Sequence, residues 1–357
     1  MPTITAITRY KLRKLLKYGV VTACVAGVLM LFNGRGERAY LGAWFLLGIW
    51  TGVLEEFLFG RRFRALAVPL QYLGKAVAVN LFTYAVLSIA LRVNTEQVLP
   101  FTAAEPITAA HFITAQDFYR LMLQVVVVTS IAILVVQLEE SMGRRSFLGL
   151  LIGRYEKPRN EERIVLSIDL VGSTALNERM SDLRYFRFLN QVYSLMTDAV
   201  LRNEAEIHKY VGDEVIFTWT MKEGTRHFNC LDLYFDIMER IRLHEADLMR
   251  EFGHVPHFRG AVHGGRVITA RIGHIKRTID LSGDVMNTVS RMLGLCKDLK
   301  ADLLVSSALL KRMPGFEKRF RVGPEQVLPV KGRRREVPLR AIERTTKSLR
   351  AMGRSRG

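Results

Sequence analysis

The sequence is poor in cysteine and lacks the short motifs of several large enzyme classes. Among its 357 residues it has only three cysteines, Cys24, Cys230 and Cys296, and they lie far apart. This spacing excludes a disulfide framework and a zinc site. A nucleophile elbow and a P-loop are both absent, and no pair of histidines has a spacing that demands haem.

Acidic residues are too few to balance the basic ones, and the formal net charge is +18. The excess is concentrated at the N-terminus, in residues 60–64 and after Lys331. A charge of this size raises the question of nucleic acid, but no nucleic-acid-binding motif accompanies it. Basic clusters beside apolar segments fit the cytoplasmic face of a membrane and its anionic lipids. We therefore expect membrane lipid, and no nucleic acid, as a partner.

Long apolar stretches fill residues 1–142, which we predict to be a membrane domain with four transmembrane helices. A span needs about 20 residues, and the first stretch is short for one. That stretch is not a cleavable signal, because other apolar stretches follow and no small-residue cleavage site is evident. The four stretches cover residues 19–33, 39–59, 66–92 and 118–138.

The basic residues of the connecting segments predict the orientation. Five Lys or Arg residues precede the first span, three lie in residues 60–64, and two follow the fourth span. The connection over residues 93–116 contains none. Two arginines in the short first loop are the one exception to this distribution of basic residues. The counts place the N-terminus and residues 143–357 in the cytoplasm, and the chain in the cell (inner) membrane.

Ionisable residues lie toward the predicted inner ends of the spans. Two interpretations are open. In one, these residues mark the edge of the membrane and Lys75 snorkels to the interface. In the other, Lys75 pairs with the glutamates and ties helices together. No motif indicates what the membrane domain senses, so its regulatory ligand is unknown. The glutamates are Glu55, Glu56, Glu139 and Glu140.

The pattern changes after residue 142. Residues 143–162 predict a helical linker that breaks near Lys157-Pro158, because the residue before a proline disfavours helix. In residues 163–342 apolar and charged residues alternate, as is typical of a soluble domain. Residues 343–357 form a basic tail that we predict to be disordered and able to touch anionic lipid.

The soluble domain is predicted to be an α+β sandwich, with helices on one face of a mainly antiparallel sheet. A hairpin is expected to turn at Gly212-Asp213, and a second at Gly264-Gly265. The expected strands are 163–169, two within 206–219, two within 257–273, and others near 303–306, 318–322, 327–331 and 336–342; the expected helices are 173–203, 226–250 and one that begins after Gly283.

Three charged motifs occur in order along this domain. The first is an aspartate at the end of a strand, the second is Lys-x-x-Gly-Asp-Glu, and the third is Asp-x-x-Gly-x-x-x-Asn-x-x-x-Arg. Their order and spacing over residues 163–342 resemble the catalytic domain of class III nucleotidyl cyclases. Their chemically distinctive members are Asp169, Lys209, Asp213, Asp280, Asn287 and Arg291.

The resemblance implies a ferredoxin-like fold and a head-to-tail homodimer with two active sites at the interface. The reaction it implies is attack of a ribose 3′-hydroxyl on the α-phosphorus of a nucleoside triphosphate, with pyrophosphate as the leaving group. In the family, one protomer supplies the metal-binding aspartates of a site and its partner supplies the other residues.

Metal binding is assigned by the resemblance to Asp169 and Asp213, together with the backbone of Ile168. Carboxylate oxygens suit Mg²⁺ or Mn²⁺, and two ions per site are expected. Gly172 and Ser173 follow the first strand and are expected to approach the phosphates. The family commonly has Gly-Phe-Thr where this chain has Gly-Ser-Thr, so the phosphate contacts stay open.

Base recognition is assigned to Lys209 and Asp280. A lysine donor and an aspartate acceptor complement the ring nitrogen and amino group of adenine, whereas guanine presents the opposite groups. Family guanylyl cyclases usually have Glu and Cys at these places. Hydrogen bonds that would otherwise go unpaired discriminate strongly between substrates. ATP is therefore the expected substrate.

The residues expected to stabilise the transition state lie on one helix. Asn287 and Arg291 lie four residues apart and thus share a helix face. The resemblance assigns the asparagine to the ribose and the arginine to the charge on the transferred phosphate. Lys331, in Val-Lys-Gly, resembles the family lysine that holds the terminal phosphates.

Each residue also has an ordinary structural reading; Asp213, for example, could be only a turn former. An ordered set of such residues is poorly explained by coincidence. The expected function is a membrane-anchored adenylyl cyclase that makes 3′,5′-cyclic AMP. The alternatives are a guanylyl cyclase and a catalytically silent nucleotide-binding scaffold, although no metal aspartate is lost. A diguanylate cyclase is disfavoured because Gly212-Asp213-Glu214 lacks the first glycine of GGDEF.

Overall fold

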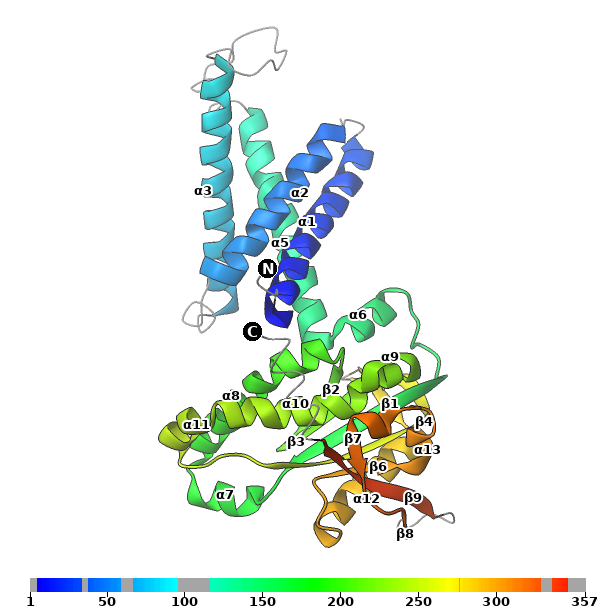
Figure 1. Cartoon of the computed structure of the whole chain (residues 1–357). Coiled ribbons are helices and arrows are strands. Elements are labelled where there is room, and N and C mark those ends of the chain that lie inside the picture. The colour runs from blue at the N-terminus through cyan, green and yellow to red at the C-terminus, as the bar shows by residue number, and fades with distance from the viewer. Residues whose placement is uncertain are drawn as a thin grey trace. The chain divides into compact units, whose positions relative to one another are not determined.

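The computed structural model describes residues 5–33, 38–58, 67–95, 116–275, 277–328 and 336–345. The chain divides into two compact units, a helical one from Thr8 to Phe147 and an α/β one from Leu148 onward (Figure 1). The division falls close to residue 142, where the sequence pattern changes.

The helical unit consists of long apolar helices. They pack around buried side chains that include Ala26, Trp44 and Val128. By length and hydropathy, two helices among the described residues are able to cross a membrane, over Ala6–Leu31 and Tyr119–Met142. The four-span arrangement therefore stays a proposal. The helices are α1 (Ala6–Asn33), α2 (Arg38–Val53), which continues into the π-helix η1 (Leu54–Leu58), α3 (Val68–Thr95) and α5 (Gln116–Met142).

Ion pairs join the helices of this unit. The Lys75 ammonium is buried and lies 2.7 Å from a carboxylate oxygen of Glu55. The burial of Lys75 argues against the interpretation that its side chain snorkels into the interface, and the alternative that it pairs with a glutamate is confirmed for Glu55. Glu139 and Glu140 pair instead with lysines of α1, and Lys14 of that helix lies 2.7 Å from Glu140.

The α/β unit is built on a mixed sheet in the order β2-β3-β1-β4-β6-β9-β7, in which β5 pairs with β4 and β8 with β9. All of its strand pairs are antiparallel except β4 with β6, so the prediction of a mainly antiparallel sheet is confirmed. The strands are β1 (Arg159–Leu170), β2 (Glu206–Val211), β3 (Glu214–Thr220), β4 (Phe258–Ile272), β5 (Thr278–Ser282), β6 (Leu303–Ser306), β7 (Phe320–Val322), β8 (Gln326–Leu328) and β9 (Val337–Arg344).

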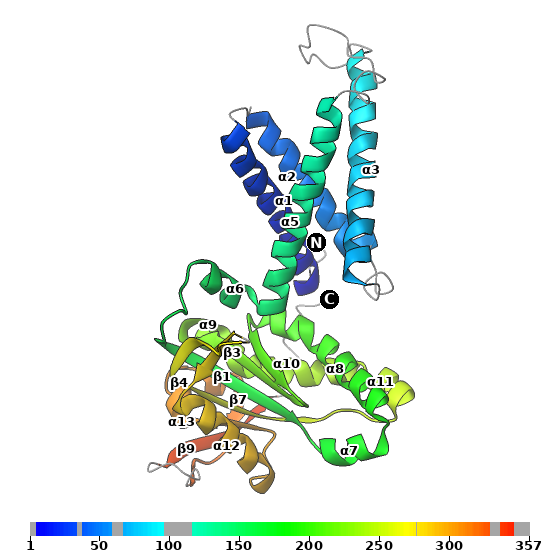
Figure 2. The ribbon, with the colours of Figure 1, turned by 180° about the vertical axis from the view of Figure 1, so that it is seen from behind.

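The helices of this unit connect the strands. They are α6 (Arg144–Leu151), which begins in the helical unit, α7 (Ser173–Arg179), α8 (Asp182–Arg202), α9 (Met221–Thr225), η3 (Arg226–Phe228), α10 (Asn229–Leu243), α11 (Glu245–Phe252), α12 (Asp284–Asp298), α13 (Ser307–Leu310) and η4 (Phe316–Lys318) (Figures 1 and 2).

Helices cover both faces of the sheet, so the prediction that they cover one face is wrong. Successive side chains of a strand point to opposite faces. Leu166 and Ile168 of β1 pack with α8 and α10 in one hydrophobic core. Val165 packs with Val289 of α12 in a second core, on the opposite face.

The predicted turn at Gly264-Gly265 is also wrong. Both glycines lie inside the continuous strand β4, where they pair with residues of β1. A Cβ at Gly264 would lie 3.0 Å from Leu309, and one at Gly265 would lie 3.0 Å from Val285. The two glycines thus permit close packing on both faces of the sheet.

Several predicted elements have different boundaries. The helix expected over 173–203 is interrupted at Met180, whose backbone is extended (φ −105°, ψ 149°), and the one over 226–250 is interrupted at His244. The linker does not stay helical to Pro158, because Gly143 has a positive φ of 81° and α6 ends at Leu151. The first strand begins four residues earlier than predicted, at Arg159.

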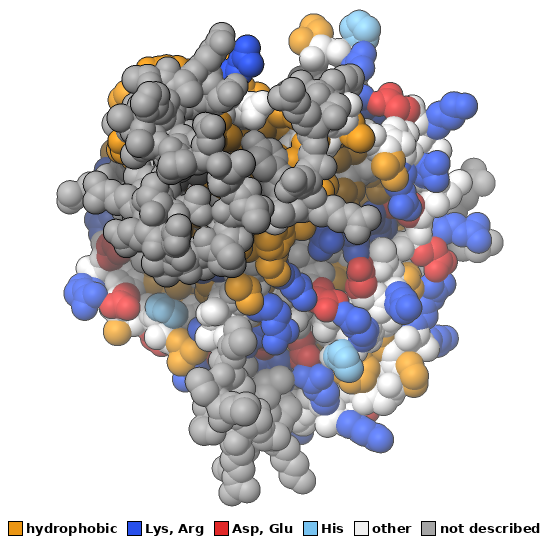
Figure 3. Space-filling view, turned by 90° about the horizontal axis from the view of Figure 1, so that it is seen from above, with side chains coloured by type: hydrophobic (Ala, Val, Ile, Leu, Met, Phe, Trp, Pro, Cys, Tyr) orange, Lys and Arg blue, Asp and Glu red, His pale blue; other side chains and the backbone are white. Residues whose placement is uncertain are grey.

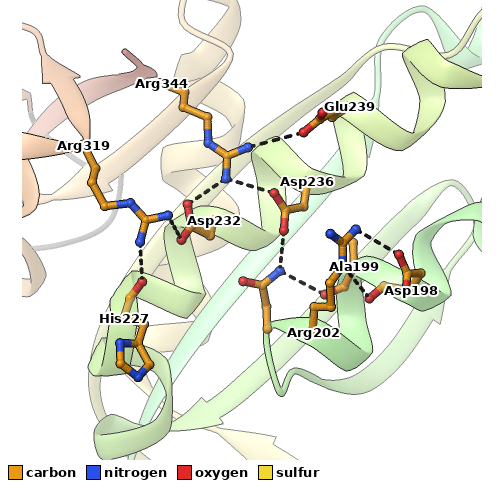
Figure 4. Close-up of polar contacts among 10 residues, drawn as sticks. Asp198, Ala199, Arg202, His227, Asp232, Asp236, Glu239, Arg319 and Arg344 are labelled. Carbon is orange, nitrogen blue, oxygen red and sulfur yellow. Dashed lines mark hydrogen bonds and ion pairs between the residues drawn. The ribbon is translucent and has the colours of Figure 1, made fainter. Parts of the chain in front are cut away.

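A buried ionic network joins α10 to β9 (Figure 4). Arg344 of β9 lies 2.8 Å from Asp232 and 2.9 Å from Asp236. Arg319 also binds Asp232, at 2.6 Å, and Asn203 of the segment after α8 donates to Asp236. Only 6% of the Arg344 side chain is exposed.

Arg344→Met is expected to destabilise the α/β unit by about 3 kcal/mol, because it leaves the buried Asp236 without its arginine and leaves Asp232 with Arg319 alone. A thermal scan of the purified chain should show the midpoint fall by roughly 6–12 °C. Arg250→Met is the matched control, since it removes an exposed pair with Asp247 and should change the midpoint little. Equal midpoints for the two variants would contradict the role of the network.

Candidate active site

Two of the predicted site aspartates lie together where β1 ends. Asp169 is the penultimate residue of β1, and Asp213 lies in the two-residue turn between β2 and β3. Gly212 begins this turn with a φ of 64°, which favours glycine. The Tyr193 hydroxyl of α8 donates to the Gly212 carbonyl at 2.8 Å. The predicted Gly212-Asp213 hairpin is therefore confirmed, and α8 helps to hold its turn.

The carboxyl groups of Asp169 and Asp213 are within hydrogen-bonding reach of each other. Burial, together with the negative charges of Asp213 and Glu214, raises the pKa of Asp169 to about 6. Ser167 hydrogen-bonds to Glu214, the residue after Asp213. Carboxylates held this close repel one another, and a cation between them would relieve the repulsion.

The donor set fits a hard divalent cation. In the part of the chain that the structure describes, no cluster of three or more His, Cys, Asp or Glu side chains is arranged to hold a metal. Mg²⁺ is often bound by one or two carboxylates, with water and substrate phosphate oxygens as the other ligands. Asp169 and Asp213 satisfy that requirement.

The other residues predicted near the metal or the phosphates are Ile168, Gly172 and Ser173. The Ile168 side chain is fully buried in the core, so only its peptide group can face a ligand. Gly172 has a φ of 73° and precedes α7, whose first residue is Ser173. The structure thus places this loop directly after Asp169.

The two predicted base-reading residues lie in contact. The Lys209 ammonium of β2 is 2.8 Å from Asp280 Oδ1 of β5. His208 Nε2 is 2.9 Å from the same oxygen. Burial alone would raise the pKa of Asp280, but hydrogen bonds from Lys209, the Leu281 N–H and His208 hold it below its usual value. Asp280 is therefore an ionised acceptor at neutral pH.

Asn287 and Arg291 lie on α12 as predicted. The helix begins after Gly283, whose φ of 136° suits only glycine. Asn287 is exposed and Arg291 is half-buried, and neither makes a hydrogen bond or ion pair with any residue that the structure describes. Both are thus available to a ligand. Lys331 lies outside the described residues.

The site residues form separate groups within one chain. Among the described residues, no hydrogen bond or ion pair joins the Asp169–Asp213 pair to the Lys209–Asp280 pair or to Asn287 and Arg291. One chain thus presents the Asp169–Asp213 pair, the Lys209–Asp280 pair and a helix with uncommitted polar side chains.

Sequence reasoning missed three contributors. His208 contacts Asp280, and Glu214 adds charge beside Asp169. Tyr193 lies within the helix expected over 173–203, which gave no sign of a polar role, yet its hydroxyl donates to the turn that contains Asp213. Strand alternation gave no sign of His208, because an irregularity in β2 brings it to the site.

Comparison with known proteins agrees with the fold and the site. The family "Adenylate and Guanylate cyclase catalytic domain" matches residues 155–341, which is more than half of the 357 residues. The chain belongs to this family, whose members are the class III nucleotidyl cyclases.

Two curated relatives illustrate the match. Adenylate cyclase 2 of Rhizobium meliloti (strain 1021) is 41% identical over 197 residues, which cover 55% of this chain and 54% of the relative. An adenylate cyclase of Anabaena cylindrica is 24% identical over 153 residues, or 42% of this chain and 30% of the relative. The chain therefore spans about half the length, or less, of these relatives.

Among solved structures, a bacterial light-regulated adenylyl cyclase is similar in fold. The TM-score is 0.53 and the identity 17%, and the match covers 68% of this chain and 71% of that one. This likeness supports the fold alone.

Proposed function

We propose that the protein is a membrane-anchored adenylyl cyclase that converts ATP to 3′,5′-cyclic AMP and pyrophosphate. The observation that carries the proposal is the contact between Lys209 and Asp280. It sets a cationic donor beside an ionised acceptor, the combination that matches the edge of adenine. The curated relatives from R. meliloti and A. cylindrica are named as adenylate cyclases, which is consistent with this substrate.

The chain's own residues account for the steps of the reaction. Lys209 donates to the adenine ring nitrogen and Asp280 accepts from the amino group. Asn287 orients the ribose, and Arg291 stabilises the negative charge that develops on the α-phosphate. Lys331 is proposed to bind the terminal phosphates, and the backbone of Gly172 and Ser173 is proposed to approach the phosphates as well.

Asp169 and Asp213, with the Ile168 carbonyl, are proposed to hold two Mg²⁺ or Mn²⁺ ions. Such ions, when bound, supply the charge that activates the attacking 3′-hydroxyl and neutralises the triphosphate.

A homodimer is proposed because the site groups are separate within one chain. The same unit exposes large apolar side chains that a second copy of the chain could cover: Phe186 of α8 is 70% exposed, Tyr210 of β2 is 49% exposed, and Ile275 of the β4–β5 connection is fully exposed. Covering such side chains removes apolar surface from water, which is favourable.

The membrane proposal retains four spans, with the N-terminus and the α/β unit in the cytoplasm of the cell membrane. The apolar helices of the first unit and the distribution of basic residues support it. On the face drawn in Figure 3, Lys and Arg side chains are interspersed with acidic and apolar ones. This mixture differs from the continuous basic patch or stripe that is typical of a nucleic-acid-binding surface. The regulatory ligand stays unidentified.

The decisive experiment offers ATP and GTP separately to the purified full-length chain, each with Mg²⁺ and with Mn²⁺. Cyclic AMP formed in clear excess over cyclic GMP is the expected result. Preferred formation of cyclic GMP would identify a guanylyl cyclase instead, and no product with either nucleotide would favour a silent nucleotide-binding scaffold.

The substitutions Lys209→Glu and Asp280→Cys, made together, are expected to reverse the base preference. The pair would then present an acceptor and a weak donor, which suit guanine and repel adenine. We expect the ratio of kcat/KM for ATP to that for GTP to fall by about a hundredfold or more. Steady-state kinetics with both nucleotides measure it. An unchanged ratio would place the base pocket elsewhere.

A further inference from the structure

His208 reaches the base-reading pair because of an irregularity in β2. The strand pairs with β3 in regular register through Ile207 opposite Phe217, but the next pair is Lys209 opposite Ile216. His208 is thus the extra residue of a β-bulge, and bulges commonly redirect side chains beside active sites.

The bulge changes the face on which Lys209 lies. Phe217 and Ile207 belong to the core under α8 and α10, whereas Ile216 packs in the core under α12. In a regular strand, residues 207 and 209 would share a face. The inserted residue moves Lys209 to the α12 face. The His208 side chain extends from β2 to the same acceptor as Lys209, the carboxylate of Asp280.

Three donors converge on one oxygen of Asp280. Oδ1 lies 2.8 Å from Lys209 Nζ, 2.9 Å from His208 Nε2 and 2.9 Å from the Leu281 N–H. No hydrogen bond reaches Oδ2 from the residues that the structure describes. The Asp280 carboxylate is therefore held through Oδ1, and Oδ2 is available to accept a hydrogen bond from a ligand.

The two side-chain donors differ in their freedom to move. The Lys209 side chain is 41% exposed and the His208 side chain 10% exposed. When a base enters, the lysine must turn toward the ring nitrogen. The imidazole is packed into the unit and has no such second task.

We propose that His208 is a positioning residue for base selection: its Nε2–H holds Asp280 Oδ1 so that Oδ2 meets the amino group of adenine. The inference rests on the proposed cyclase function. It adds a residue that determines how strictly the existing acceptor excludes guanine, whose carbonyl would face Oδ2. Without the imidazole, the carboxylate can rotate away from that carbonyl, and discrimination weakens.

The electrostatics are consistent with a neutral donor. Burial lowers the pKa of His208, with a further contribution from the charge of Lys209, while the hydrogen bond to Asp280 opposes the shift. A neutral imidazole protonated at Nε2 donates one hydrogen bond to Asp280, and it adds no positive charge that would compete with Lys209 for the carboxylate.

The test compares His208→Leu with His208→Gln in the full-length chain. Leucine removes the donor, whereas the glutamine amide can donate from a similar reach. For the leucine variant we expect the ratio of kcat/KM for ATP to that for GTP to fall about tenfold, because adenine loses a fixed acceptor and guanine meets less repulsion. The glutamine variant should recover most of the ratio.

A double-mutant cycle separates positioning from general damage. If His208 acts through Asp280, then His208→Leu made in an Asp280→Ser background should change the ratio by less than about twofold. His257→Leu is the matched control, because it removes another histidine-to-aspartate contact of 2.9 Å, to Asp302, between exposed side chains. Its ratio should equal that of the wild type.

The outcomes distinguish the two proposals. Absence of cyclic nucleotide from the wild-type chain would overturn the proposed function itself. An active wild type, with an unchanged ATP:GTP ratio in a folded His208→Leu variant, would overturn the role of His208 alone. Loss of activity toward both nucleotides to the same extent, not recovered by glutamine, would also overturn it.

Discussion

Asp213→Ala is expected to lower cyclic AMP formation by about a thousandfold, because it removes one of the two carboxylates that would bind the catalytic cations. The turn itself should survive, since the positive φ belongs to Gly212 and the Tyr193 hydroxyl binds a backbone carbonyl. Activity at saturating ATP with Mg²⁺ and with Mn²⁺ is the measurement.

Thermal stability provides an independent reading of the same site. Because Asp213 raises the pKa of Asp169 by repulsion, its removal should leave the metal-free chain as stable as the wild type or more so. Mn²⁺ should raise the melting temperature of the wild type but not that of the variant. Asp247→Ala, at an exposed position of α11, is the control. Normal activity of Asp213→Ala, or an unaltered response to Mn²⁺, would contradict the assignment.

Co-expression of Asp213→Ala with Arg291→Ala is expected to restore activity that neither variant has alone. A symmetric dimer has two equivalent sites, each built from both chains. In a mixed dimer, one site would carry both substitutions and the other would carry neither. If chains pair at random, half of the dimers are mixed, so about a quarter of all sites should be intact.

The two variants should be expressed together, with different affinity tags, because membrane-anchored subunits can exchange slowly. Activity measured on doubly purified mixed dimers should reach about half of the wild-type value, since one of their two sites is intact. No activity in proven mixed dimers would show that each site is built within one chain.

Much of the fold was predictable because it follows from local patterns. The hairpin at Gly212-Asp213 was correctly predicted, since a tight turn between apolar strands has a local signature. The helix after Gly283 was also correctly predicted. The turn expected at Gly264-Gly265 was wrong because glycine signals both a turn and a close approach, and only the packing of Leu309 and Val285 distinguishes the two.

By itself the sequence determined which residues are the main candidates for the site and how those on one element are spaced. Asn287 and Arg291 share a helix face because they are four residues apart. Lys209 and Asp213 lie in the same hairpin, on its first strand and in its turn. Only the tertiary structure decided that Lys209 meets Asp280, that α12 covers the opposite face from α8, and that His208 joins the pair. These features depend on a bulge in β2 and on contacts between strands distant in sequence. Such contacts arise from packing of the whole sheet and leave no local pattern in the chain.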